Sequence, residues 1–137
     1  MPDPTTFSPA VRRFLTAPVR FAAIATSGAD GTPHQAVVWY ALDDEGILVN
    51  SLVGRRWPAD LQRDPRIALT VLDPDLEAEF YVTVQAEAVV AATGDRAVRD
   101  IQDLARRYGS DPSSFEGLER ISFRLVPRSV TVHGDLD

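Results

Sequence analysis

Two adjacent arginines that follow a glycine, in the segment Gly54-Arg55-Arg56, form the most suggestive chemical group in the sequence. They come directly after an apolar run, Ile47–Val53, and before Pro58, which suits the first turn of a helix. A helix start offers free backbone N–H groups and the positive end of the helix dipole, and guanidinium groups bind oxyanions through paired hydrogen bonds. The junction therefore predicts an anion site, most simply for a phosphate. The alternative is that both arginines are ordinary solvated surface charges.

Few other side chains could carry chemistry. The 137 residues contain no cysteine, and all 14 basic residues are arginine, which excludes disulfides, thiolate metal sites, cysteine nucleophiles and Schiff-base lysines. The two histidines, His34 and His133, are too few and too far apart in the sequence to suggest a histidine metal site. No nucleophile elbow, dinucleotide-binding glycine motif or Walker motif occurs. If the protein is an enzyme, we therefore expect a bound cofactor to supply the chemistry.

Length, charge and hydropathy limit the classes of partner. The formal net charge of −6 repels nucleic acid and anionic membrane surfaces, although a local arginine patch could still hold a small anion. The first ten residues lack the basic and apolar regions of a signal peptide, and no apolar run is long enough to span a membrane. We therefore expect one cytoplasmic domain over residues 1–137, with residues 1–10 as an N-terminal arm, and no nucleic-acid or membrane partner.

The elements that must position this junction are mostly strands. Short apolar runs separated by glycine-bearing turns are typical of an antiparallel meander. Helical spacing of apolar residues is confined to a short segment that starts at Ser8-Pro9 and to Asp95–Tyr108, with a further capping box possible at Ser113. The sequence therefore predicts a mainly β fold, a small β-barrel of about six strands with peripheral helices. The expected strands are Phe21–Thr26, Pro33–Leu42, Ile47–Val53, Ile67–Leu72, Glu79–Val90 and a closing strand from Ile121 to Val132.

Three features of these elements stay open on the residues alone. His34, at the start of a strand, could be a surface residue, a backbone partner or part of a site. Trp39 and Tyr40 point to opposite faces of their strand, as core or dimer contacts or as a platform for a planar ring. The inward alternation of the closing strand slips near Pro127, which predicts a bulge or kink.

Several motifs, taken in order, resemble one known family. These are Ala25-Thr26, the Asp30-Gly31 turn, the strand from Pro33 to Tyr40, and the run from Arg55 through Leu69 that contains Arg63-Asp64-Pro65-Arg66. The later strand E-F-Y-V-T-V-Q-A-E-A and the closing strand Arg120–Val130 fit the same order. Together they resemble the flavin- and deazaflavin-binding split-barrel proteins related to pyridoxamine 5′-phosphate oxidase, over roughly Val11 to Gly134. The compact length and the Trp39-Tyr40 pair look closest to the branch that uses coenzyme F-420.

The resemblance implies a six-stranded antiparallel split β-barrel that forms a homodimer, with the cofactor in a groove between the subunits. It implies an oxidoreductase that passes hydride from reduced F-420 to a small unsaturated or conjugated substrate. The alternatives are an FMN-dependent oxidoreductase related to pyridoxamine 5′-phosphate oxidase and a non-catalytic protein that binds a flavin, deazaflavin or heme. By the same resemblance, one strand lines the ring system and the next junction holds the phosphate and its tail, through His34, Gln35, Ala36, Val37 and Trp39, and through Ser51, Val53, Gly54, Arg55, Arg56 and Trp57.

The sequence departs from the family pattern at two positions. Trp57 stands where the family has a lysine, and Asp60 stands where it has an asparagine. A charged hydrogen bond of the lost kind is worth roughly 1.5–3 kcal/mol, so its loss weakens cofactor binding without abolishing it. Bidentate contacts from Arg55 and Arg56 could compensate, and the Trp57 indole could stack on a ring. Alternatively, this member binds another ligand or has lost its cofactor.

Overall fold

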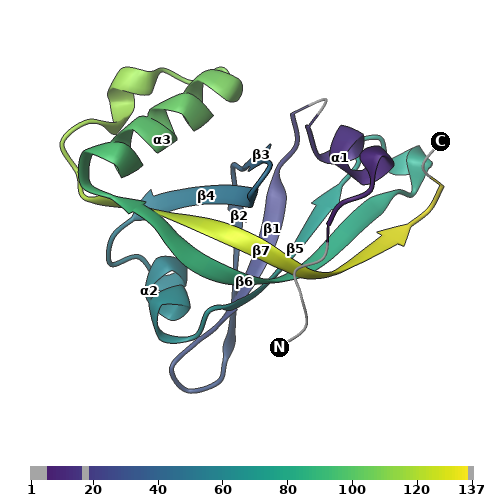
Figure 1. Cartoon of the computed structure of the whole chain (residues 1–137), viewed down its shortest axis with the longest axis horizontal. Helices are drawn as coiled ribbons and strands as arrows, with labels where there is room; N and C mark the ends of the chain where they lie inside the picture. The colour runs from purple at the N-terminus through teal and green to yellow at the C-terminus, as the bar shows by residue number, and fades with distance from the viewer. Residues whose placement is uncertain (1–5, 17–18, 136–137) are drawn as a thin grey trace.

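All strands of the protein belong to a single antiparallel sheet in a computed structural model, which describes residues 6–16 and 19–135. Figure 1 shows the strongly curved sheet, with α3 lying over one end of it and α1 at the other. The strands lie in the order β2-β1-β5-β6-β7-β4-β3. In chain order they are β1 (Ala22–Ser27), β2 (Pro33–Val38), β3 (Ala41–Asp43), β4 (Gly46–Leu52), β5 (Arg66–Leu72), β6 (Tyr81–Thr93) and β7 (Arg120–His133).

Two parts of the barrel prediction are wrong. The sheet has seven strands rather than six, and β2 and β3 at its two ends are not hydrogen-bonded to each other, so the barrel is not closed. The extra strand arises because the apolar run Pro33–Leu42 is interrupted at Trp39-Tyr40. There the Tyr40 side chain is fully buried, its hydroxyl donates to the Leu15 carbonyl at 2.7 Å, and its backbone N–H donates to the Tyr108 hydroxyl at 3.1 Å. These contacts replace a strand ladder.

The two longest strands, β6 and β7, form the middle of the sheet and confirm the predicted irregularity. Gln85 is opposite Ser129, but Ala86 is opposite Pro127, so one residue of β7 is left over in a bulge. A second register shift follows between Val90 and Ala92. The bulge at Pro127 is where the inward alternation slips in the sequence, because an extra residue reverses the facing of everything beyond it.

In the described part of the chain, three α-helices and two single-turn 3-10 helices lie outside the sheet. Helix α1 (Pro9–Thr16) begins as predicted, with the Ser8 hydroxyl accepting the Val11 N–H at 3.2 Å. Helix α3 (Gly94–Arg107) confirms the long helix. The turns are η1 (Leu76–Ala78) and η2 (Pro112–Phe115), and η2 is capped by Asp111 rather than by Ser113. Of the predicted arm, residues 1–5 lie outside the described part, Phe7 is buried in the core, and α1 already begins at Pro9.

Helix α2 (Arg56–Arg63) connects β4 to β5 and contacts β1 and β2. Its Trp57 and Leu61 side chains are buried in the same core as residues of β4 and β7, with the Trp57 ring centroid 6.0 Å from that of Phe123. This inward face fixes the helix against the sheet, which in turn fixes where its first residue lies. Among the described helices, none is both long and apolar enough to cross a membrane.

Candidate anion-binding site

The junction between β4 and α2 is a short, tightly held loop. Beyond the end of β4, the Val53 N–H donates to the Glu119 carbonyl at 3.0 Å, and the Arg55 N–H donates to the Leu52 carbonyl at 3.3 Å. Between them, Gly54 has φ +91°, a left-handed conformation that a side chain would strain. The backbone of Arg55 is extended. Arg55 occupies the N-cap position of α2, but its side chain makes no capping hydrogen bond, and Arg56 is the first helical residue. The turn therefore delivers both arginines to the start of the helix.

Arg55 and Arg56 are exposed, and within the described residues neither guanidinium group has an ion pair or a hydrogen bond. The first turn of α2 also contains no acidic residue that would neutralise the helix dipole. Two cations and the free N–H groups of a helix start without any acid at the same place fit an oxyanion such as phosphate.

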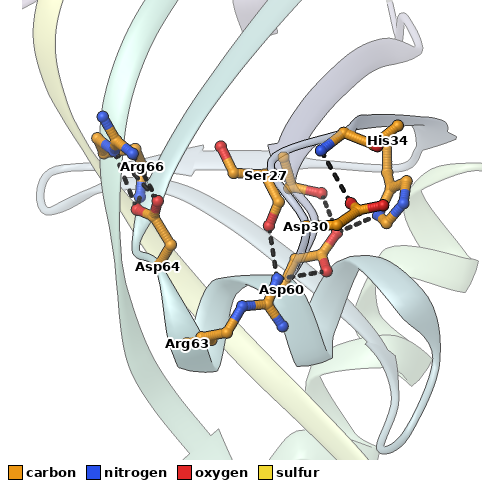
Figure 2. A network of polar contacts seen from close by, with 9 residues as sticks. Ser27, Asp30, His34, Asp60, Arg63, Asp64 and Arg66 are labelled. Atoms are coloured by element: carbon orange, nitrogen blue, oxygen red, sulfur yellow. Dashed lines mark hydrogen bonds and ion pairs between the residues drawn. The ribbon is translucent and has the colours of Figure 1, made fainter.

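The second half of α2 is different, because it is built around a buried carboxylate. Asp60 Oδ2 accepts the Thr26 hydroxyl at 2.8 Å and lies 2.6 Å from His34 Nδ1, while its Oδ1 accepts from Arg63 Nη2 at 3.0 Å. Figure 2 shows His34 of β2 beside Asp60 and Arg63 of α2, with Ser27 of β1 next to them. Arg63 also donates to the Ser27 carbonyl at 2.7 Å. Asp60 thus fastens the helix to the first two strands.

Electrostatics in this half keep the carboxylates ionised. Burial alone raises the pKa of Asp60, but the hydrogen bonds from His34, Thr26 and Arg63 outweigh it, so the net pKa is lowered. Just beyond the helix, hydrogen bonds from the Arg66 side chain and backbone lower the pKa of Asp64 to about 2. Both groups are therefore fixed negative charges at neutral pH with partners already in place, and they are not free to bind a ligand cation.

The remaining site residues predicted by the resemblance are spread over several environments. On β2, Gln35 and Val37 are exposed, Ala36 is half-buried, and His34 is held by Asp60. Trp39 is stacked on Tyr108 at 5.1 Å between ring centroids and meets Phe115 edge-on at 5.9 Å. These aromatic contacts lie within the chain and hold the end of β2 against α3 and η2.

The phosphate half of the prediction is more compact. Val53, Gly54, Arg55 and Arg56 are exposed together, whereas Ser51 is buried in β4 and only 9% of Trp57 is exposed. A surface hollow of about 320 Å³ on the outer face of the sheet is lined by Val37 and contains neither arginine. Another of about 660 Å³ is lined by Val53 and contains no residue of β2. The two halves of the predicted site do not meet in either hollow.

Sequence reasoning missed two sets of residues near α2. The Thr26–His34–Asp60 cluster joins positions 26 and 34 residues apart, and Asp60 stood out only as a departure from the family pattern. Arg120, which lies beside the junction, was seen only as the start of the closing strand. Its position depends on the pairing of β7 with β4, for which the local sequence gives no signal.

Comparisons with known proteins decide the family. The family model described as pyridoxamine 5′-phosphate oxidase matches residues 7–133. This chain belongs to the pyridoxamine 5′-phosphate oxidase family. No curated protein sequence matches it. The family assignment agrees with the mainly β architecture.

Solved structures share the family fold at low sequence identity. An F420 reductase is 23% identical, with 87% of this chain and 94% of that chain covered and a TM-score of 0.74. HutZ, a heme storage protein from Vibrio cholerae, is 19% identical, with 93% and 95% covered and a TM-score of 0.74. The conserved protein Rv2991 from Mycobacterium tuberculosis is 21% identical, with 98% and 88% covered and a TM-score of 0.77. At these identities the similarity establishes the fold, which serves both redox and heme-binding proteins.

Proposed function

We propose that this protein is an oxidoreductase that binds the deazaflavin coenzyme F-420 between two copies of the chain and passes hydride to a small unsaturated or conjugated substrate. The observation that carries the proposal is the pair Arg55 and Arg56, which are exposed at a helix start and lack acid partners in the described part of the chain. The fold similarity to an F420 reductase supports the choice of cofactor.

The roles of the residues follow from the contacts they have left free. Arg55 and Arg56 would hold the phosphate, because both guanidinium groups can form paired hydrogen bonds to it. The exposed Gln35 and Val37 on β2 would contact the ring. Trp57 is buried in the core, so its expected stacking on a ring is the weakest part of the predicted set. Bound cofactor would supply the hydride chemistry, and the protein would orient it and exclude water.

A second copy of the chain would complete the site. The outer face of the sheet carries apolar side chains, with Phe21 57% exposed, Val37 70% and Leu72 50%, around the hollow of about 320 Å³. Such a contiguous patch favours association with another protein surface. Val37 belongs to this face, but Arg55 and Arg56 do not line the hollow beside it, so one chain does not bring the two halves of the predicted site together there. We therefore expect a homodimer in which each chain contributes part of the cofactor groove.

Two other functions have specific support. FMN carries a phosphate and is the cofactor of the second alternative, an oxidoreductase related to the oxidase for which the family model is named. Storage or shielding of a flavin, deazaflavin or heme without turnover is the third, and it is supported by the absence of an evident catalytic side chain and by the neighbour described as a heme storage protein. A panel of electron acceptors separates the third from the others, since bound cofactor would then never be reoxidised in a substrate-dependent way.

The test is a side-by-side titration of the purified protein with F-420 and FMN, followed by absorbance and fluorescence. We expect tighter binding of F-420, and at least a tenfold loss of affinity when Arg55 and Arg56 are both replaced by alanine. Arg106→Ala is the matched control, because Arg106 is exposed on α3 and paired with Asp103. Failure of the wild-type protein to bind either cofactor would reject the proposal, and preference for FMN would favour the second alternative.

A further inference from the structure

The pairing of β4 with β7 brings a third arginine to the junction. Leu52, the last residue of β4, lies opposite Arg120, the first residue of β7. The next residue, Val53, donates its N–H to the carbonyl of Glu119 at 3.0 Å. The loop that carries Arg55 is therefore hydrogen-bonded to the segment that carries Arg120. Although 65 positions separate the two arginines in the sequence, the ladder brings their backbone segments to the same end of two neighbouring strands.

The Arg120 guanidinium group is held in an unusual environment for a cation. Its Nη1 donates to Asn50 Oδ1 at 3.1 Å, its carbon lies 5.1 Å from the centre of the Phe115 ring, and its Nε is buried with no hydrogen-bond partner. Burial, and then the positive charge of Arg55, lower the pKa of Arg120. Among the ion pairs of the described residues, none includes Arg120. Its positive charge is therefore met only by an amide oxygen and a ring face.

Asn50 keeps Arg120 in this place. The two hydrogens of its Nδ2 group are used by the Ala97 carbonyl of α3 and by the Ser122 hydroxyl, both at 2.8 Å. Ser122 in turn donates to Asp100 Oδ2 at 2.8 Å, and Asn50, Ser122 and Asp100 are all buried. With its nitrogen committed to α3 and β7, Asn50 can only present its oxygen to Arg120. Asn50 is thus a positioning residue for the guanidinium group.

We infer that Arg120 is the third cation of the anion site formed by Arg55 and Arg56, and that the site is built for a group with at least two negative charges, such as a phosphate monoester or a diphosphate. Asp95, Glu116 and Glu119 line the same hollow as Arg120, but none of them forms an ion pair with it. Three guanidinium groups that have no ion-pair partner among the described residues repel one another, and an anion of higher charge removes more of that repulsion than a singly charged one. The inference rests on the anion-binding part of the proposed function, but it does not depend on which ring the ligand carries.

The experiment uses inorganic pyrophosphate as a probe of the site without any ring. Thermal unfolding of the full chain is followed with pyrophosphate and, at matched ionic strength, with sodium chloride. We expect pyrophosphate to raise the unfolding temperature of the wild-type protein, and its apparent Kd to rise at least fivefold in Arg120→Gln. Arg124→Gln is the matched control, because Arg124 lies four residues further along the same strand and is paired with Asp43. Its pyrophosphate response should match that of the wild-type protein.

A second arm compares FMN with riboflavin, which has the same ring without the phosphate. Arg120→Gln should weaken FMN binding at least fivefold and change riboflavin binding less than twofold. Arg120→Lys keeps the charge, so it should respond to pyrophosphate more strongly than the glutamine variant. An equal pyrophosphate response in the wild-type protein and Arg120→Gln, or none in the wild-type protein, overturns the inference. A pyrophosphate response that depends on Arg120, in a protein that binds neither FMN nor F-420, retains the inference and rejects the cofactor.

Discussion

The two ends of α2 are opposites in how their charges are satisfied. At its far end, the buried carboxylate of Asp60 has a partner for each oxygen, from Thr26, His34 and Arg63. At its start, Arg55 and Arg56 carry two positive charges with no acid among the described residues to pair with them. A fully paired polar group stabilises the fold that surrounds it, whereas an unpaired cluster of like charges weakens it. This difference indicates that the Asp60 network anchors α2 to the sheet, while the start of the helix is left available to bind an anion.

The largest effect should come from breaking the anchored end. Asp60→Ala leaves His34 and the Thr26 hydroxyl without their acceptor inside the structure, so we expect it to lower the free energy of unfolding by about 3 kcal/mol. Urea denaturation measures this. Asp103→Ala is the control, because Asp103 is an exposed partner of Arg106 on α3 and should cost less than about 0.5 kcal/mol. Equal effects of the two replacements would show that the Asp60 network does not anchor the helix.

The acid range offers a second, smaller test of the same end. Asp60 and Asp64 have folded-state pKa values below the usual 3.8, in the case of Asp64 about 2. As the pH falls below about 4, the unfolded chain therefore takes up protons before the folded protein does, and the free energy of unfolding decreases. Urea denaturation between pH 5 and pH 3 should show a shallower decrease for Asp60→Ala than for the wild-type protein. Parallel curves would mean that the Asp60 carboxyl is not held ionised by its partners.

Much of the fold was predictable because its signals are local. The alternation in β6 and the apolar spacing in α3 lie within single segments, and Pro127 marked its own bulge. The division of Pro33–Leu42 into two strands could not be predicted, because it depends on Tyr108, whose hydroxyl takes the Tyr40 N–H from 68 residues away. The extra strand depends on that long-range contact and on the hydrogen bond of the Tyr40 hydroxyl to the Leu15 carbonyl.

The site divides in the same way. Gly54, Arg55 and Arg56 are consecutive, so a glycine turn and a helix start were enough to predict that they lie together. Asp60 was visible only as a substitution, because its partners come from two strands far along the chain. Arg120 could be placed only once the register of β4 with β7 was known. Local sequence therefore does not reveal those parts of a site whose residues are brought together only by the pairing of distant strands.

The smallest expected effect comes from changing the start of α2, where the arginines have no ion pair, and here the free energy of unfolding should rise rather than fall. Arg55→Gln removes a positive charge that lies near Arg120 and lowers its pKa, so it should leave the fold intact and raise the free energy of unfolding by up to about 0.5 kcal/mol at low salt. The gain should vanish at about 1 M salt, where charges are screened over about 3 Å. Arg106→Gln, which loses its ion pair with Asp103, should show no gain at either salt concentration. If Arg55→Gln instead destabilises the protein more than Arg106→Gln does, Arg55 supports the fold and the two ends of α2 are not opposites. If it stabilises the protein, the retained arginine makes the ligand-free protein less stable, which is expected of a residue whose partner is a bound anion.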